Sequence, residues 1–213
     1  MQAQESSALV TGKPATGPGS RGRYPKGVLR RQEILDRTIE VFAELGFEST
    51  SLRAIGEAIG VSHAALRRYF ETREELFLEV LREKDRQALA AARADGTPHG
   101  IDFARHLDSF ASQTPGLMAL RHSMIARALE PGNETSQAFF VERYESLRSG
   151  AREILLLARE AGVLRPDIPI DAAAALVIAT MDGLSTQWLL DRRVDMHEGM
   201  ILFESLLQPP RPE

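Results

Sequence analysis

The residues with the clearest capacity for chemistry lie in the stretch VSHAALRRYF, residues 61–70. In a helix, His63 and Arg67 lie one turn apart. Ala64 and Arg68 repeat that spacing, so the four side chains share one face. Small side chains at the start of a helix let it enter the major groove of DNA, while arginines further along reach phosphates or guanine edges. The pattern therefore favours a surface that binds a polyanion. The alternative is a solvated helix face with spare arginines.

The residues before and around this stretch have the spacing of a helix-turn-helix. Two helices that cross closely need a small residue at the crossing and a turn residue that tolerates positive φ. Gly56 and Gly60 meet these two needs, four residues apart. The second helix then needs inward side chains, which we predict to be Val61, Ala65, Leu66, Tyr69 and Phe70.

Charge is segregated along the chain. Residues 1–31 carry six basic residues against one glutamate, whereas residues 87–213 carry 12 arginines against 17 acidic residues. A basic end joined to an acidic body is typical of a chain that contacts a polyanion at one end. A basic tail that only aids solubility is the alternative. Residues 1–26 are rich in Gly, Pro, Ser, Thr and Ala, so we predict a flexible arm there.

Several classes of function are disfavoured. The 213-residue chain has no cysteine, which excludes disulfides and thiolate chemistry. No set of His, Asp or Glu has metal-ligand spacing, and we find neither a Ser/His/Asp arrangement nor a glycine-rich phosphate loop. The longest uninterrupted apolar run, residues 172–181, is about half of the ~20 residues that a membrane helix needs. We therefore predict a soluble cytoplasmic protein that is not an enzyme, needs no cofactor and binds no membrane.

The pattern along the chain is helical, and no strand alternation is convincing. Gly46 is a helix stop signal, and Thr50 or Ser51 caps the next helix. The sequence TREE contains a capping box, because Glu75 lies three residues after Thr72. We predict an all-α fold of about nine helices: 28–45, a short one ended by Gly60, 62–69, 73–94, 101–113, 116–129, 135–161, 171–190 and 197–207.

Residues 34–81 resemble the DNA-binding domain of the TetR family of transcriptional regulators. The resemblance rests on the Phe-Ala-x-x-Gly-Phe ending of the first helix, on Thr-Ser-Leu-Arg-x-Ile from Thr50, and on Gly-Val-Ser from Gly60. It also includes Phe70 before the capped Arg-Glu-Glu-Leu. It implies an all-helical homodimer with an N-terminal helix-turn-helix and a larger C-terminal domain that binds a small ligand and dimerises.

The resemblance also implies roles for single residues. The start of the second helix binds phosphate through backbone amides, the start of the third faces the major groove, and cationic or phenolic residues after it clamp phosphates. The implied DNA-binding positions are Thr50, Ser51, Arg53, Ser62, His63, Ala64, Arg67, Arg68, Tyr69 and Arg73. The arm residues Arg21, Arg23 and Lys26 enter a minor groove or follow the DNA backbone, unless the arm stays disordered on DNA.

Four positions depart from the family pattern. Relatives often carry Tyr at Arg67, His at Tyr69, Lys at Arg73 and Ala at Gly56. Arg67 and Arg73 keep a charge that suits phosphate. Arg67 can also read a base as a bidentate donor, which a tyrosine cannot do, so its role stays open.

The C-terminal part is similar to that of regulators with a BetI-type domain, from the sequence REAGVL to QWLL. This similarity places the dimer contact on the last two helices, for which we predict Leu184, Trp188, Leu189, Phe203 and Leu207. Candidate effector-binding residues mix aromatic, methionine and polar side chains on three consecutive predicted helices, as apolar ligand sites do. They are Phe103, His106, Phe110, Met118, Arg121, His122, Ile125, Phe139, Phe140 and Tyr144. Ordinary packing within one chain is the alternative for both sets.

The predicted organisation is a flexible basic arm (1–26), a helix-turn-helix domain (27–72) and a ligand-binding and dimerisation domain (73–213). The predicted function is a ligand-responsive regulator, in the first place a repressor. It binds palindromic operator DNA as a dimer and is released by a small apolar or amphipathic effector. The alternative is an all-helical protein-interaction module whose helix-turn-helix no longer binds DNA. The helix at 73–94 joins the two domains, so we expect it to transmit the effector's signal.

Overall fold

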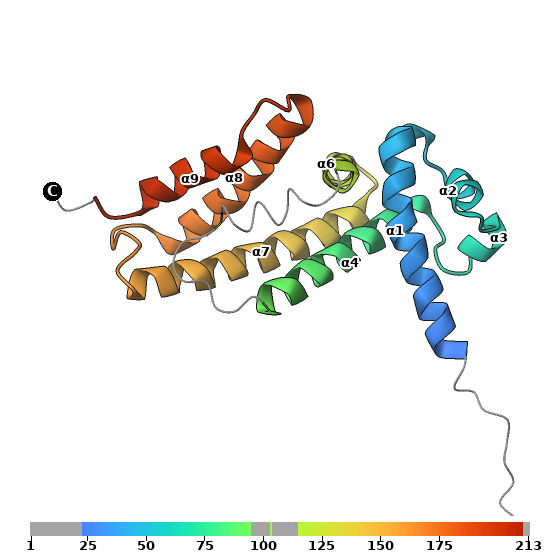
Figure 1. The fold of residues 1–213 in the computed structure, drawn as a ribbon, viewed down its shortest axis with the longest axis horizontal. Helices are drawn as coiled ribbons and strands as arrows, with labels where there is room; N and C mark the ends of the chain where they lie inside the picture. The colour runs from blue at the N-terminus through green and yellow to red at the C-terminus, as the bar shows by residue number, and fades with distance from the viewer. Residues whose placement is uncertain (1–22, 95–102, 104–114, 211–213) are drawn as a thin grey trace, which may run out of the picture.

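The computed structural model describes residues 23–94, 103 and 115–210. These residues form helices and connecting turns without a strand, which confirms the predicted all-α fold. Figure 1 shows a small head at one end and an elongated body at the other. The head consists of α1 (Arg23–Ser49), α2 (Leu52–Ile59) and α3 (His63–Leu66). The body consists of α4 (Arg73–Ala94), α6 (Pro115–Ala128), α7 (Glu134–Glu160), α8 (Ile170–Leu190) and α9 (Met196–Leu207).

Helix α1 is longer than predicted at both ends. It begins at Arg23, inside the segment predicted as a flexible arm, because Pro25 falls in the first turn, where a missing N–H breaks no intrahelical bond. At the other end the chain bends at Gly46, which has φ 72° and ψ 177°, and helical structure resumes as far as Ser49. The stop signal at Gly46 therefore acts as a kink between two helical pieces.

The helix-turn-helix forms as its glycines and caps predict. Ser51 rather than Thr50 is the N-cap of α2, and its hydroxyl accepts a hydrogen bond from the Ala54 N–H at 3.1 Å. Gly60 takes the left-handed conformation at φ 70°. A Cβ at Gly56 would lie 2.6 Å from the Val61 carbonyl oxygen, so the two helices can cross only because this residue has no side chain.

A first core lies where the head meets the body. It joins buried residues of α1, α2, α3 and the turn after α3 to those of α4, α6 and α7, among them Phe42, Phe70 and Phe77. The rings of Phe42 and Phe77 meet edge to face with centroids 5.7 Å apart. Thr72 caps the start of α4, since the Glu75 N–H donates to the Thr72 hydroxyl at 3.0 Å. The Glu75 carboxylate accepts from the Glu71 N–H at 2.6 Å and not from the Thr72 N–H, so only half of the predicted capping box forms. The head is thus packed directly on the body.

A second core fills the far part of the body and is built from α6, α7, α8 and α9. The observed bounds of these four helices agree with the predicted ones to within one residue at each end. The predicted helix at 101–113 lies outside the described residues except for Phe103, which is buried in this core. Helices α8 and α9 approach closely at Gly199, where a Cβ would lie 2.9 Å from a Leu184 methyl carbon.

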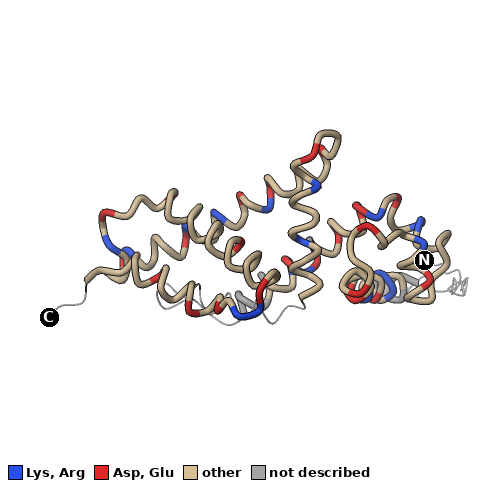
Figure 2. The backbone as a smooth tube through the Cα atoms, turned by 90° about the horizontal axis from the view of Figure 1, so that it is seen from above, with Lys and Arg blue, Asp and Glu red and all other residues tan. Residues whose placement is uncertain are grey.

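Helix α8 is long and apolar enough to cross a membrane by length and composition alone. Only 22 % of the most apolar 18-residue stretch of this helix is buried within the chain, so much of its apolar surface is exposed. Helix α9 also exposes large apolar side chains. Figure 2 shows that the tube near the C-terminus carries few Lys, Arg, Asp or Glu residues. We call the exposed apolar side chains of the two helices the α8–α9 apolar face: Leu176, Leu190, Ile201, Leu202 and Leu206.

Candidate nucleic-acid interface and effector site

The face of α3 that the sequence predicts to be outward is outward in the structure. His63, Ala64, Arg67 and Arg68 are all exposed. Ser62 caps the helix, and its hydroxyl accepts from the Ala65 N–H at 3.2 Å. Within the described part of the chain, neither Arg67 nor Arg68 forms an ion pair, so both guanidinium groups are available to a polyanion.

Helix α3 ends earlier than predicted, and this moves one aromatic residue outward. The α-helix stops at Leu66, and Arg67 to Tyr69 continue as a tight turn in which the Tyr69 N–H bonds to the Leu66 carbonyl at 2.9 Å. Phe70 is buried, as predicted, but Tyr69 is 40 % exposed, so its predicted inward position was wrong. Its hydroxyl can therefore approach a phosphate, which stays a prediction.

The start of α2 offers backbone amides rather than the Thr50 side chain. Thr50 is fully buried, and its hydroxyl donates to the Gly46 carbonyl at 2.5 Å. Arg53 is exposed and pairs with Glu57 at 2.8 Å, an interaction that a phosphate can replace at small cost because exposed ion pairs are weak. Of the arm residues, Arg21 lies outside the described residues, and Arg23 and Lys26 belong to the first turn of α1.

Arg73, predicted as a phosphate clamp, is engaged inside the protein. Its Nη1 donates to the carbonyls of Phe47 at 2.9 Å and Thr50 at 3.3 Å. Its Nε donates to Glu74 at 2.9 Å, and its guanidinium lies 4.6 Å from the centre of the Phe47 ring. A phosphate contact by Arg73 would have to compete with these bonds, and sequence spacing gave no sign of them.

The predicted effector residues divide between the two cores. Ile125, Phe139 and Phe140 pack in or against the first core, and Phe103 and Met118 lie in the second. His106 and Phe110 lie outside the described residues. The described members of the predicted set are therefore spread over both cores, and their role in binding an effector stays a prediction.

The remaining three predicted residues, Arg121, His122 and Tyr144, belong to a polar layer between the cores. The Tyr144 hydroxyl donates to Asp182 Oδ2 at 2.6 Å, and His122 Nε2 lies 3.0 Å from the Ser185 hydroxyl. Ser185 in turn donates to the Asp182 carbonyl at 2.9 Å. The polar layer thus links α6 and α7 to α8.

Arg143 extends the polar layer to α4. It is buried and donates to both carboxylate oxygens of Asp85, at 2.7 and 3.1 Å. Sequence reasoning missed the partners Asp85, Asp182 and Ser185. The pair Asp182 and Ser185, three residues apart in a mostly apolar helix, is a signal that could have identified two of them.

Burial shifts the titration of the polar layer. Desolvation, with help from the charge of Arg143, lowers the pKa of the Arg121 guanidinium to about 9. Desolvation also lowers the pKa of His122, so the imidazole is neutral near pH 7. Burial and the bond to Asp182 raise the pKa of Tyr144, which keeps the phenol as a donor. These groups can recognise a polar group on a small molecule that is otherwise apolar.

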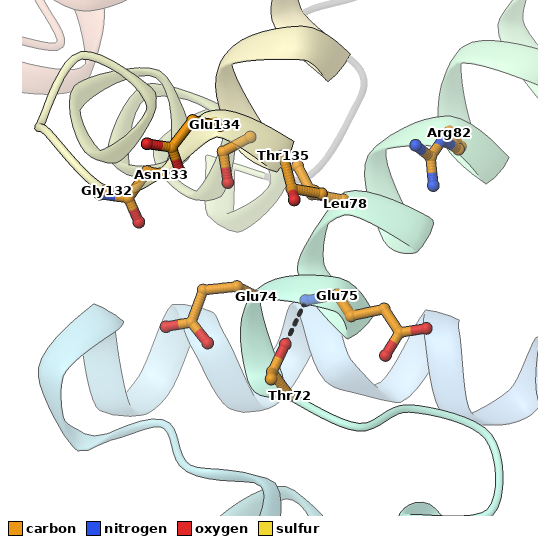
Figure 3. A pocket seen from close by; sticks show the side chains of 10 residues that line it. Thr72, Glu74, Glu75, Leu78, Arg82, Gly132, Asn133, Glu134 and Thr135 are labelled. Carbon is orange, nitrogen blue, oxygen red and sulfur yellow. Dashed lines mark hydrogen bonds between the residues drawn. The ribbon is translucent and has the colours of Figure 1, made fainter.

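An open groove lies at the junction of head and body, with a volume of about 330 Å³ (Figure 3). It separates the first turns of α4 and α7, and its walls carry several carboxylates beside Arg82. The lining residues are Thr72, Glu74, Glu75, Leu78, Arg82, Gly132, Asn133, Glu134, Thr135 and Ser136. This lining does not suit an apolar effector, and the described residues contain no cluster of His, Asp or Glu that could hold a metal ion.

A helix-turn-helix head with an exposed basic face, packed on a helical body with a buried polar layer, defines a DNA-binding transcriptional regulator. Comparison with known proteins agrees. Residues 34–80 match the family described as bacterial regulatory proteins, tetR family, and residues 103–208 match the C-terminal domain of BetI-type transcriptional repressors. The chain belongs to the TetR family, and it is therefore a regulator and not an enzyme.

Individual relatives are distant. The chain is 28 % identical to the HTH-type transcriptional repressor Rv1474c of Mycobacterium tuberculosis, over 73 % of this chain and 80 % of the relative. It is 25 % identical to the regulator TcmR of Streptomyces glaucescens, over 100 % and 96 % of the two chains. A regulator from Saccharomonospora viridis, solved in complex with choline, has a similar fold with a TM-score of 0.70 and 20 % identity, over 86 % of this chain and 100 % of that one.

Proposed function

We propose that this protein is a dimeric repressor that binds palindromic operator DNA through α3 and leaves it when a small effector binds in the body. The observation that carries the proposal is the exposed surface formed by α3 and the turn after it. There Arg67 and Arg68 follow His63 and Ala64, and neither arginine forms an ion pair with another described residue. Relatives named as transcriptional repressors support it.

The α8–α9 apolar face supports the dimer. Leu190 is 84 % exposed and Leu206 is 64 % exposed, and a second copy would bury both together with the rest of the face. Four of the interface residues predicted from sequence, including Trp188 and Phe203, instead pack against the second core, and Leu207 is buried within it. We therefore assign the contact to the α8–α9 apolar face, on the outer sides of the same two helices. Two heads would then read half-sites about 34–36 Å apart.

The polar layer supports an effector site. Arg121, His122 and Tyr144 are polar groups with apolar cores on both sides, so a ligand there gains both burial and orientation. The choline complex of a protein with this fold is consistent with a small polar or charged head group. We assume one conformation whose heads fit the operator and one whose heads do not. A ligand shifts the equilibrium between them by no more than the difference between its affinities for the two.

The salt dependence of DNA binding tests the proposal. The DNA is the region upstream of the protein's own gene, with random DNA of equal length as competitor. We expect a preference for the upstream region and a steep loss of affinity as salt rises, because phosphate contacts release counterions. No preference over random DNA, or affinity that does not change with salt, would contradict it and favour a protein-interaction module.

Substitution then tests the α3 face directly. Each of Arg67→Ala and Arg68→Ala should weaken DNA binding. Loss of a phosphate contact should also reduce, by about 1, the slope of the logarithm of the binding constant against the logarithm of the salt concentration. A residue that reads a base instead relaxes sequence preference at one position, at a cost of about 1–3 kcal/mol. The matched control is Arg148→Ala on α7, an exposed arginine paired with Glu145, which should change neither the affinity nor the slope.

A further inference from the structure

The ring of Phe47 lies where the head, α4 and α6 meet. It follows the kink at Gly46 and contacts Phe42 of α1 and Phe77 of α4, with ring centroids 6.4 and 5.7 Å apart. It packs against the first core without being fully buried. Any change in the angle between head and body must therefore move this ring against its neighbours.

Two guanidinium groups lie against this one ring. Arg73, the first residue of α4, is 4.6 Å from the ring centre, and Arg127, in the last turn of α6, is 5.8 Å from it. Both distances fall within the range of a cation–π interaction. Each arginine also has a carboxylate partner, Glu74 at 2.9 Å and Glu130 at 2.7 Å, which limits repulsion between the two cations.

The contacts of both arginines indicate that they hold the ring. The Nε of Arg127 is buried and has no hydrogen-bond partner within the described part of the chain. A buried N–H without an acceptor is unfavourable, and the aromatic ring that this guanidinium contacts is that of Phe47. Arg73 donates to the carbonyls of Phe47 and Thr50, and so ties the end of α1 to the start of α4.

We propose that Arg73 and Arg127 form a clamp on Phe47, the Phe47 clamp, that sets the orientation of the head on the body. In this role Arg73 acts within the protein rather than on DNA.

The consequence of the Phe47 clamp for regulation rests on the proposed function. Arg127 lies on α6, six residues after Arg121 and five after His122, so displacement of α6 by an effector in the polar layer reaches Phe47 directly. The signal then travels through α6 and not only along α4.

The experiment measures head–body distance without DNA or effector. Because the chain has no cysteine, spin labels can be placed at Ala58→Cys on α2 and Glu153→Cys on α7, both exposed. Labelled protein is mixed with excess unlabelled protein, and the distance between the two spin labels is measured by double electron–electron resonance. The dilution ensures that distances within one chain dominate the signal. We expect a single narrow distribution for the parent protein, and a broad or shifted one for Phe47→Leu, Arg127→Gln and Arg73→Gln.

Further variants separate the clamp from general packing. Phe47→Tyr keeps the ring face and should restore the narrow distribution, and Arg148→Gln should leave it unchanged. Arg127→Gln lies at the edge of the core, so it should retain the melting temperature to within a few degrees. If the proposed function also holds, Arg127→Gln changes DNA affinity by about 2- to 30-fold.

Two results would overturn the proposal. One is a parental distance distribution in both Phe47→Leu and Arg127→Gln. The other is weaker DNA binding by Arg73→Gln with an unchanged distribution, which would make Arg73 a phosphate contact. A parent protein that does not bind DNA would refute the proposed function alone, because the distance measurement does not depend on DNA.

Discussion

Replacement of Arg143 by methionine tests whether the polar layer stabilises the body. Arg143 donates two hydrogen bonds to Asp85, and its side chain is 7 % exposed. Removal of one partner of a buried pair costs about 3–5 kcal/mol. Two features lower this figure. The Asp85 side chain is 37 % exposed, so water can solvate the carboxylate left behind. Arg143 also lowers the pKa of Arg121 by repulsion, and its removal relieves that repulsion. We expect a net loss of about 2 kcal/mol.

Urea denaturation followed by circular dichroism measures this loss. For a chain of this size, about 2 kcal/mol corresponds to a fall of about 4–8 °C in melting temperature. The matched control is Arg148→Met on the same helix, where both partners of the ion pair with Glu145 are at least 36 % exposed. Its effect should stay within about 0.5 kcal/mol.

A double-mutant cycle with Asp85→Asn isolates the pair. The cycle should show a coupling energy of about 1.5–3 kcal/mol, because the bond joins two charged groups. Coupling below about 0.5 kcal/mol, or an Arg143→Met loss no larger than that of the control, would refute the reasoning. Either result would mean that the buried guanidinium gains no more from Asp85 than an apolar side chain gains from packing there.

The other predictions concern the turn, the polar layer and the dimer. Gly60→Ala should destabilise the head by about 1–2 kcal/mol, measured by denaturation, because Gly60 has φ 70°. Since folding lowers the pKa of His122, the unfolded chain binds more protons, and stability should fall as pH drops below about 6.5. Melting curves of His122→Asn should lose part of this dependence. Leu202→Glu with Leu206→Glu should give monomers by sedimentation, whereas Leu157→Glu, on the outer side of α7, should not. Monomers in the parent protein would contradict the dimer.

The helix-turn-helix was predictable because its signals are local. Gly56, Gly60 and the caps Ser62 and Thr72 each act within a few residues of their own position. The bounds of α6 to α9 follow for the same reason, since prolines, glycines and the Asp195 cap of α9 end one helix or begin the next. Helical spacing predicted the exposed positions of His63 and Ala64 on α3. It placed Tyr69 wrongly, because the α-helix ends at Leu66 and the residues after it form a turn.

The polar layer and the engagement of Arg73 were not predictable in this way. Arg143 and Asp85 lie 58 residues apart, and Arg73 and Phe47 lie 26 apart, so only tertiary packing brings them together. Spacing within α8 and α9 likewise identifies apolar side chains but does not show which of them are the most exposed in the structure. Leu184 was predicted at the dimer contact, yet it packs against Gly199 of its own chain. The distance to a neighbouring helix, and not hydrophobicity, decides which apolar side chains of α8 and α9 are buried within the chain.

The first core has a consequence for engineering. A boundary between residues 72 and 73 follows the end of the helix-turn-helix, but it cuts through this core, because Phe77 of α4 packs with Phe42 of α1. Gly116 of α6 also lies so close to α1 that a Cβ there would be 2.7 Å from the Ala43 Cβ. A chimaera that places this reading head on another sensor must therefore carry the first turns of α4 and the whole of α6. The exchangeable part of the molecule is thus larger than its DNA-binding motif.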